Sequence, residues 1–317
     1  MPVTSGESRM GTPSRTVEDA VVFDADRDRK VQLSFNLAPG RSSMLRRARI
    51  ASLLTLAAAT LIASAALAVP TLPGINIRWD NCYADGGVMN RTFACDTNTG
   101  TDLMAVSVQL DTGMLNVSGM EIRVSLKSSA PPLPAWWDFK NSGSCRQLAL
   151  DFVAFSDAVL PPGGTCVDWG QGHGGGGAVA GYHVDEIGPG SAVILIAAAV
   201  PSSNLVQLDP VTEYTVGVIR MNHSNTVGTG ACSGCDTPVC ILFTSLNITT
   251  PVLANNRLLT TGANTVDSQI IHWQSGHLVN LVNTCTGTFS CTTQFDCVAG
   301  VTASRRSTWG AVKSLYR

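Results

Sequence analysis

Apolar and polar residues alternate in short runs along most of the chain after residue 69, and turn-forming residues separate the runs. In the run MEIRVSL, Met120, Ile122, Val124 and Leu126 fall on one side and Glu121, Arg123 and Ser125 on the other. This period of two is typical of a half-buried strand. Runs of this kind predict strands at Ile75–Trp79, Leu103–Leu110, Leu115–Leu126, Gln147–Phe155, Ala192–Val200, Tyr214–Asn222, Val239–Ile248, Ser268–Trp273 and Leu278–Val282.

Two stretches depart from this alternation. Ala192–Val200 is apolar throughout, which predicts a central strand covered on both faces or a buried helix segment. The glycine-rich stretch Gly170–Gly181 predicts a long loop or an internal boundary.

Helix signals are few. A proline cluster precedes Ala135–Lys140, where we expect one or two helical turns. Residues 69–317 contain 14 Asp but only three Glu and three Lys, whereas exposed helices are rich in Glu and Lys. Gly, Thr, Ser, Asn and Val are abundant instead, as in strands and turns. The sequence therefore predicts an all-β fold, an antiparallel β-sandwich with few short helices.

Residues 44–68 have the three parts of an export signal. Arg46, Arg47 and Arg49 form a basic start, residues 50–67 carry no charge, and residues 66–68 form an A-x-A cleavage site. This pattern predicts a signal peptide cut after Ala68. The alternative is a retained membrane anchor, because about 18 uncharged residues can span a bilayer. Serine and threonine dilute the apolar run and favour the cleaved signal.

The chain then divides into four predicted parts. We expect residues 1–43 to be disordered or to lie upstream of the true translation start at Met44. Residues 44–68 are the signal peptide and residues 69–300 the β-sandwich domain. Residues 301–317 form a separate tail in which Trp309, Val312 and Tyr316 share one face at helical spacing. The tail either docks on the sandwich as a helix or contacts export or surface machinery.

Charge narrows the class of partner. Residues 69–317 contain 12 bases and 17 acids, and 12 − 17 gives a net charge of −5. Nucleic-acid binding needs a basic surface, so nucleic acid is not expected as a partner. No stable membrane span is expected to remain after cleavage. An extracellular protein or a glycan fits better, with the protein secreted, periplasmic or on the cell surface.

An even number of cysteines in an exported chain predicts disulfides. The ten are Cys82, Cys95, Cys145, Cys166, Cys232, Cys235, Cys240, Cys285, Cys291 and Cys297. Proximity in sequence suggests Cys82 with Cys95 and Cys145 with Cys166. The competing interpretation is a zinc site at Cys232, Cys235 and Cys240, but a second ligand pair at zinc-finger spacing is absent from the sequence.

The stretch DTNTGTD offers oxygen side chains at Asp96, Asn98 and Asp102, with a spacing similar to that of a calcium loop. It lacks the bidentate Glu of a full EF-hand loop, so an Asx-rich turn is the alternative. Calcium is the one cofactor that the sequence suggests.

Three more features are candidate ligand contacts. The adjacent Trp136 and Trp137 either stack on sugars or fill a core. His173, His183 and Asp185 surround the glycine run, where HGGG is similar to the oxyanion loop of esterases, and His183 with Asp185 suggests a metal site. The partner motif G-x-S-x-G is absent from the sequence, which favours a surface loop.

The segments RWDNCYADGG, NRTFACDTNTG and STWGAVKSLYR resemble a group of uncharacterised secreted bacterial proteins that are rich in β-structure. The resemblance implies an exported β-rich protein and brings no catalytic residues with it. We predict a secreted or cell-surface binding or structural protein rather than an enzyme. The alternative is a secreted hydrolase acting on glycans or esters, which for glycans needs two carboxylates about 5–9 Å apart.

Overall fold

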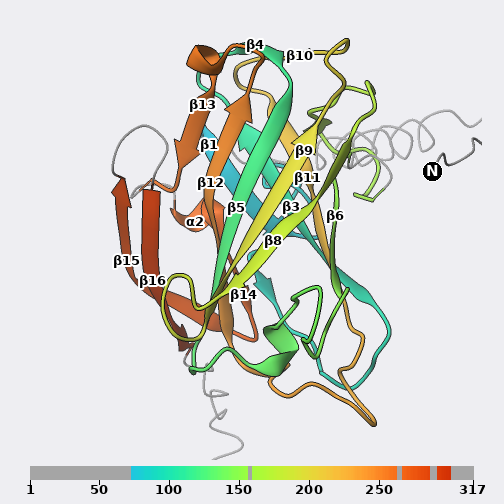
Figure 1. Cartoon of the computed structure of the whole chain (residues 1–317), viewed down its shortest axis with the longest axis vertical. Helices are drawn as coiled ribbons and strands as arrows, with labels where there is room; N and C mark the ends of the chain where they lie inside the picture. The colour runs from blue at the N-terminus through green and yellow to red at the C-terminus, as the bar shows by residue number, and fades with distance from the viewer. Residues whose placement is uncertain (1–72, 156–158, 263–265, 286–290, 301–317) are drawn as a thin grey trace, which may run out of the picture. The chain divides into compact units, whose positions relative to one another are not determined.

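The computed structural model describes residues 73–155, 159–262, 266–285 and 291–300 (Figure 1). The chain divides into two compact units, Met1–Ala65 and Ala66–Arg317, and every described residue belongs to the second. The predictions for residues 1–43, 44–68 and 301–317 therefore lie outside the described residues. Within the described part, no helix is both long enough and apolar enough to cross a membrane.

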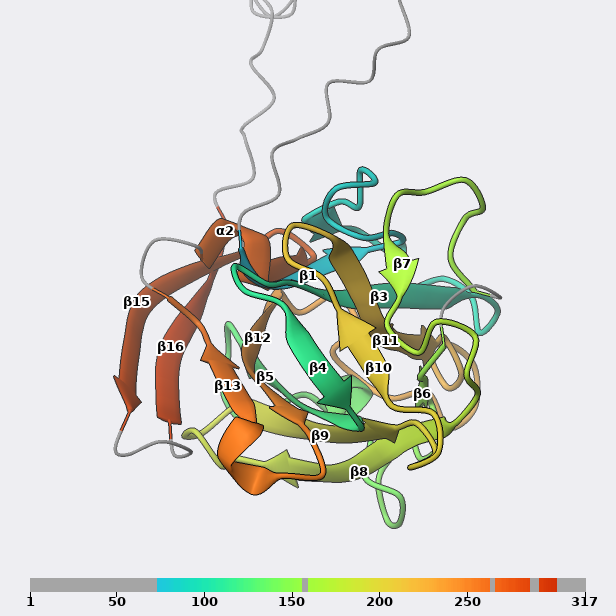
Figure 2. The ribbon, with the colours of Figure 1, turned by 90° about the horizontal axis from the view of Figure 1, so that it is seen from above.

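Two sheets face each other as the layers of a sandwich (Figure 2). The five-stranded sheet has the order β1-β3-β11-β6, with β7 beside β11. Its strands are β1 (Gly74–Trp79), β3 (Thr101–Gln109), β6 (Leu150–Val153), β7 (Val167–Asp168) and β11 (Glu213–Asn222). The seven-stranded sheet has the order β2-β14-β12-β5-β9-β8, with β13 beside β12. Its strands are β2 (Asn90–Arg91), β5 (Gly119–Ser128), β8 (Gly176–Val184), β9 (Ser191–Ala199), β12 (Val239–Thr249), β13 (Arg257–Thr260) and β14 (Ile270–Trp273).

Two strand pairs and three short helices complete the described residues. The pairs are β4 (Met114–Val117) with β10 (Val206–Leu208) and β15 (Gly276–Cys285) with β16 (Cys291–Ala299). The helices are the 3-10 turns η1 (Ala135–Trp137) and η3 (Leu253–Asn255) and the one-turn α2 (Val266–Gln269). The strand pairings are antiparallel, apart from the two-residue contacts of β7 with β11 and of β2 with β14. The predicted antiparallel all-β sandwich with few short helices is confirmed.

The predicted strand Leu115–Leu126 is in fact two strands that belong to different sheets. Ser118 separates β4 from β5, and its backbone N–H donates to Thr249 O at 2.8 Å. Asn116 has a left-handed φ of 57°, which turns the chain just before this point. The apolar positions shift here by one residue, from Leu115 and Val117 to Met120 and Ile122, and the prediction of a single strand overlooked this shift.

The prediction of a long loop over Gly170–Gly181 is wrong for its second half. From Gly176 onward the chain forms β8, which pairs with β9 along its length. A Cβ atom at Gly177 would lie 2.8 Å from Ala154 Cβ and 2.9 Å from Phe152 Cε1. Glycine is therefore needed where β8 approaches β6 of the other sheet, and a composition typical of loops here marks a close contact between strands.

Four disulfides cross-link the sandwich: Cys82–Cys166, Cys95–Cys235, Cys145–Cys232 and Cys240–Cys297. Disulfides are confirmed for these eight cysteines, but both pairings suggested by proximity are wrong. The bonded partners are 57 to 140 residues apart in sequence, because strand pairing brings distant segments together. The zinc interpretation is also wrong, since its three cysteines belong to three different disulfides. Cys285 and Cys291 face each other in backbone register, while their side chains lie outside the described residues.

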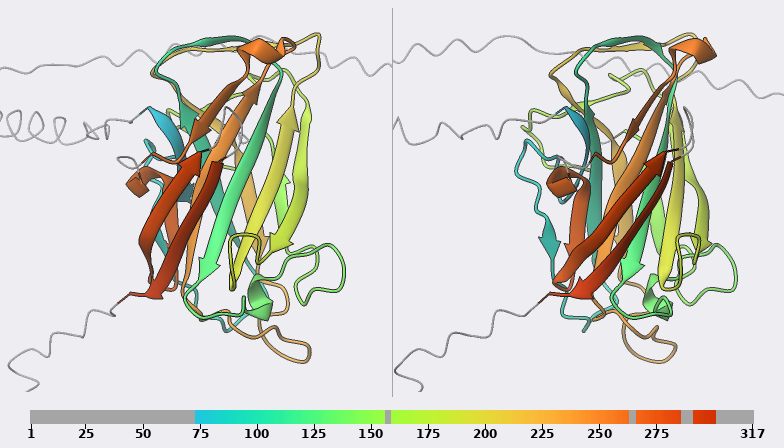
Figure 3. Two further views of the ribbon diagram at one scale, coloured as in Figure 1. Left: turned by 60° about the vertical axis from the view of Figure 1, so that its left-hand side comes forward. Right: turned by 90° about the vertical axis from the view of Figure 1, so that its left-hand side faces the viewer.

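The β15–β16 pair packs on the outer face of the seven-stranded sheet, the face turned away from the other sheet (Figure 3). A small apolar cluster joins the pair to this face, formed by Cys240, Leu242, Ile270, Phe295 and Cys297. The cluster lies near the end of β12 that begins at Val239. None of the described residues covers the other end of the outer face, toward Thr249.

Candidate binding site

Trp136 and Trp137 lie in the core and offer no face to a ligand. Their exposed fractions are 0% and 1%, and both rings pack against Trp273. The indole Nε1 of Trp136 donates to Thr226 Oγ1 at 3.0 Å. Of the two interpretations of this aromatic pair, the structure shows core packing.

Two of the three residues of the calcium-like loop, Asn98 and Asp102, are engaged with other protein groups. Asp96 is exposed, whereas Asn98 Oδ1 accepts hydrogen bonds from the backbone N–H groups of Thr226 at 2.7 Å and Val227 at 2.9 Å. These bonds connect Asn98 to the loop that follows β11, 128 and 129 residues further along the chain.

Asp102 is buried and pairs with two basic side chains. Its Oδ1 lies 2.7 Å from Arg91 Nε, and its Oδ2 lies 2.8 Å from His223 Nε2. The other ring nitrogen of His223 lies 3.0 Å from Thr99 O, and the ring stacks on Phe93 with centroids 3.9 Å apart. Both oxygens of the Asp102 carboxylate are thus used within the protein.

We expect a chelator to leave the melting midpoint unchanged, because Asn98 and Asp102 already have protein partners. An ion bound at 100 times its Kd would raise the midpoint by roughly 5–10 °C. Thermal unfolding with EDTA and with added calcium measures the difference. A calcium-dependent rise that is lost in Asp96→Asn would contradict this expectation and support the calcium loop.

His173, His183 and Asp185 are not gathered at one place. His183 lies on β8, and Asp185 follows it in the turn to β9, where its Oδ1 accepts a hydrogen bond from Gly190 N at 2.8 Å. His173 precedes β8 at the opposite end of the strand, so the nine residues of β8 lie between it and Asp185. The glycine run and the side chains of His173, His183 and Asp185 therefore do not form one compact site.

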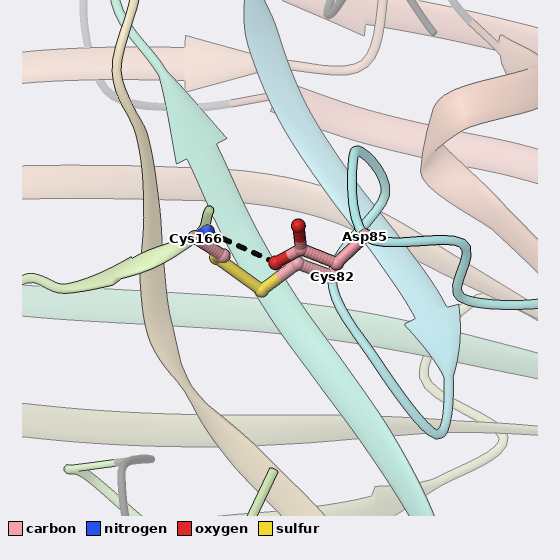
Figure 4. A group of neighbouring side chains, drawn as sticks. All are labelled: Cys82, Asp85 and Cys166. Carbon is pink, nitrogen blue, oxygen red and sulfur yellow. Dashed lines mark hydrogen bonds between the residues drawn. A yellow bond between two sulfur atoms is a disulfide. The ribbon is translucent and has the colours of Figure 1, made fainter. Parts of the chain in front are cut away.

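In the described part of the chain, one group of three potential metal-ligand atoms occurs, at Cys82, Asp85 and Cys166 (Figure 4). The two sulfur atoms form a disulfide and are not thiolate ligands. Asp85 accepts hydrogen bonds from Thr165 N and Oγ1, both at 2.7 Å, and from Cys166 N at 2.9 Å. Burial acts to raise the pKa of Asp85, but these bonds outweigh it and lower the pKa. The group anchors a loop.

The loop that contains Asp85 also donates hydrogen bonds to a buried carboxylate, that of Glu213. Glu213 accepts hydrogen bonds from Ser107 Oγ at 2.5 Å, Ala84 N at 2.8 Å and Tyr83 N at 3.1 Å. Burial raises the pKa of Glu213 despite these three donors. The exposed fraction of Glu213 is 4%, so its carboxylate stabilises the loop after β1 from the protein interior and is not a surface group.

A hollow lies on the open part of the outer face, and we call it the outer groove. Its volume is about 790 Å³. Strands β5, β9 and β12 form the floor, while β13 and η3 form one wall; these strands lie toward the viewer in Figure 1. The lining residues are Ser118, Glu121, Ile122, Arg123, Ala180, Leu195, Ile196, Ala197, Ser245, Asn247, Thr249, Thr250, Leu253, Asn256 and Leu258. A second hollow of about 360 Å³ shares four of them and extends the groove toward Leu205.

The groove combines aliphatic side chains with two charged groups whose positions are fixed by partners. Glu121 Oε2 accepts a hydrogen bond from Asn247 Nδ2 at 2.8 Å. Arg123 Nη2 lies 2.5 Å from Glu186 Oε1 at the edge of the groove. Leu253 on η3 is 80% exposed and adds an unburied apolar side chain to the wall. Among the described lining residues there is no Trp, Tyr or Phe.

Sequence reasoning identified part of this groove without recognising it as a site. The alternation in MEIRVSL placed Glu121 and Arg123 on the side opposite the core. Asn247 and Leu253 carried no signal, because they belong to strands and turns whose neighbours are set by the fold. Comparisons with protein-family models, with curated proteins and with solved structures find no match.

Proposed function

We propose that the chain is an exported binding protein that acts in an oxidising compartment outside the cytoplasm. Four disulfides within the described residues support such a setting, because disulfides persist in secreted, periplasmic and surface proteins. The pattern of residues 44–68 supports export with cleavage after Ala68. In this proposal the sandwich is a rigid support and carries its ligand on one face.

The outer groove is the observation that carries the proposal. Its volume suits a ligand, and its floor is built from three paired strands that fix the lining side chains. Aliphatic lining, with Glu121 and Asn247 as polar contacts, suits a polypeptide segment. Exposed aromatic rings would suit a glycan better, because sugars stack on them, but Trp136 and Trp137 are buried. We therefore propose an extracellular protein as the partner.

The hydrolase alternative has less support from the described residues. Glu121 and Arg123 are the charged lining residues of the groove, and each has a partner that fixes it. Two convergent carboxylates would be required for glycoside cleavage. Asp185 accepts a hydrogen bond from Gly190 N in the turn after β8. The binding interpretation needs no cofactor.

Blocking the groove tests this function. Ala197 is an exposed floor residue, so we expect Ala197→Arg to fill the groove without disturbing the core and to lower affinity at least about tenfold. The control is Gln147→Arg, an exposed residue outside the groove lining. The measurement is binding of the purified protein to peptide and glycan arrays. Binding to glycans alone, or peptide binding that Ala197→Arg leaves intact, would contradict the proposal.

A further inference from the structure

The outer groove presents a charge and a shape that select among polypeptides. Glu121 has a neutral partner, Asn247, and therefore keeps an uncompensated negative charge. Arg123 is neutralised by Glu186, so these charged groups sum to −1. Around them lie Leu195, Ala197, Leu253 and Leu258. A ligand with an aliphatic or aromatic stripe and basic flanks complements both features.

The described chain stops on the same outer face, away from the groove. Gly300 N donates to Ser275 O at 2.7 Å, close to the end of β12 that begins at Val239. The groove lining on β12 starts at Ser245, six residues along the strand, or about 20 Å away. Six extended residues after Gly300 span about 20 Å, and eleven further residues in a helix span about 16 Å. A segment of this length can reach the groove and cover it.

The chain supplies such a segment. Residues 301–317 contain Arg305, Arg306, Lys313 and Arg317 and no acidic residue, which gives a charge of +4. Trp309, Val312 and Tyr316 fall on one face at helical spacing. An amphipathic helix binds a groove through anchors at this spacing.

We propose that the outer groove binds residues 305–317 of its own chain, with the Trp309–Val312–Tyr316 stripe on the aliphatic floor and basic side chains near Glu121. The inference rests on the proposed function, because it names the class of ligand that the groove accepts. Tethering supplies an effective concentration in the millimolar range, so even a weak contact is largely formed. An external partner then has to displace the segment, which makes its affinity lower than that of a chain with the segment disabled.

The test uses a fluorescein-labelled synthetic peptide of residues 301–317 and the full chain. In the triple variant Trp309→Ser, Val312→Ser and Tyr316→Ser, the attached segment no longer competes. We expect this variant to bind the peptide at least about tenfold more tightly than the unchanged chain. Adding Ala197→Arg is expected to abolish that binding, whereas adding Gln147→Arg leaves it intact. A scrambled peptide of the same composition controls for charge alone.

Three results would overturn the inference. The first is failure of the triple variant to bind the peptide, and the second is binding that Ala197→Arg does not reduce. Concentration-dependent association of the unchanged chain, lost in the triple variant, would assign the groove to a second copy and overturn the intramolecular contact. If array peptides still bind in a manner sensitive to Ala197→Arg, the proposed function stands while this inference falls.

Discussion

Replacement of Trp136 by alanine is expected to lower the free energy of unfolding by about 3–5 kcal/mol. The side chain is fully buried, and its ring lies 5.1 Å from that of Trp273 and 5.2 Å from that of Trp137, measured between centroids. The Arg146 guanidinium lies 3.6 Å above the Trp136 ring. Alanine would leave a large cavity and remove the stacking partner of this cation.

Arg146 makes this substitution more costly than loss of volume alone. Its side chain is fully buried, and burial lowers its pKa to about 9. It donates to Trp136 O at 3.1 Å and also to Asn222 O. At neutral pH, below this pKa, the group still carries its charge, and the indole face is part of what compensates for the lost hydration.

Urea denaturation followed by circular dichroism measures the effect on Trp136→Ala. Leu253→Ala is the matched control, because Leu253 is 80% exposed and its truncation should change stability by less than about 0.5 kcal/mol. If Trp136→Ala lowered the free energy of unfolding by less than about 1 kcal/mol, the result would contradict core packing and indicate that the aromatic pair lies at the surface.

The strand pattern was predictable because the two faces of each strand meet different surroundings. Met120, Ile122 and Val124 alternate with polar residues since one face of β5 packs on the core. The same local rule says nothing about what lies on the other face. Part of it is covered by Phe295 of β16 and part is the outer groove, and this division depends on contacts between segments far apart in sequence.

For a related reason, the sequence could not show which of the candidate site residues are exposed to a ligand. Side-chain chemistry identified Trp136, Trp137 and Asp102, but burial decides whether such groups meet a ligand or one another. The disulfide partners were missed on the same grounds: Cys95 lies closest in sequence to Cys82 but bonds to Cys235, 140 residues away. Proximity along the chain carries little information in a sandwich whose neighbouring strands are distant in sequence.

Asp102→Ala is expected to lower the free energy of unfolding by about 3 kcal/mol. The substitution leaves the buried His223 ring without its carboxylate and removes one of the two acidic partners of Arg91, which also contacts Asp80. A buried pair that loses one member leaves the other without compensation, and this explains a cost larger than that of a surface ion pair.

Asp96→Ala is the control for Asp102→Ala, since Asp96 precedes β3 in the same sequence motif but is exposed, and its effect should stay within about 0.5 kcal/mol. A double-mutant cycle with His223→Gln isolates the pair: the two losses should sum to more than the loss in the double variant. Additive losses would mean that Asp102 stabilises the protein independently of His223. Equal, small effects of Asp96→Ala and Asp102→Ala would instead favour the exposed loop that the sequence motif suggested, with both carboxylates free to meet an ion.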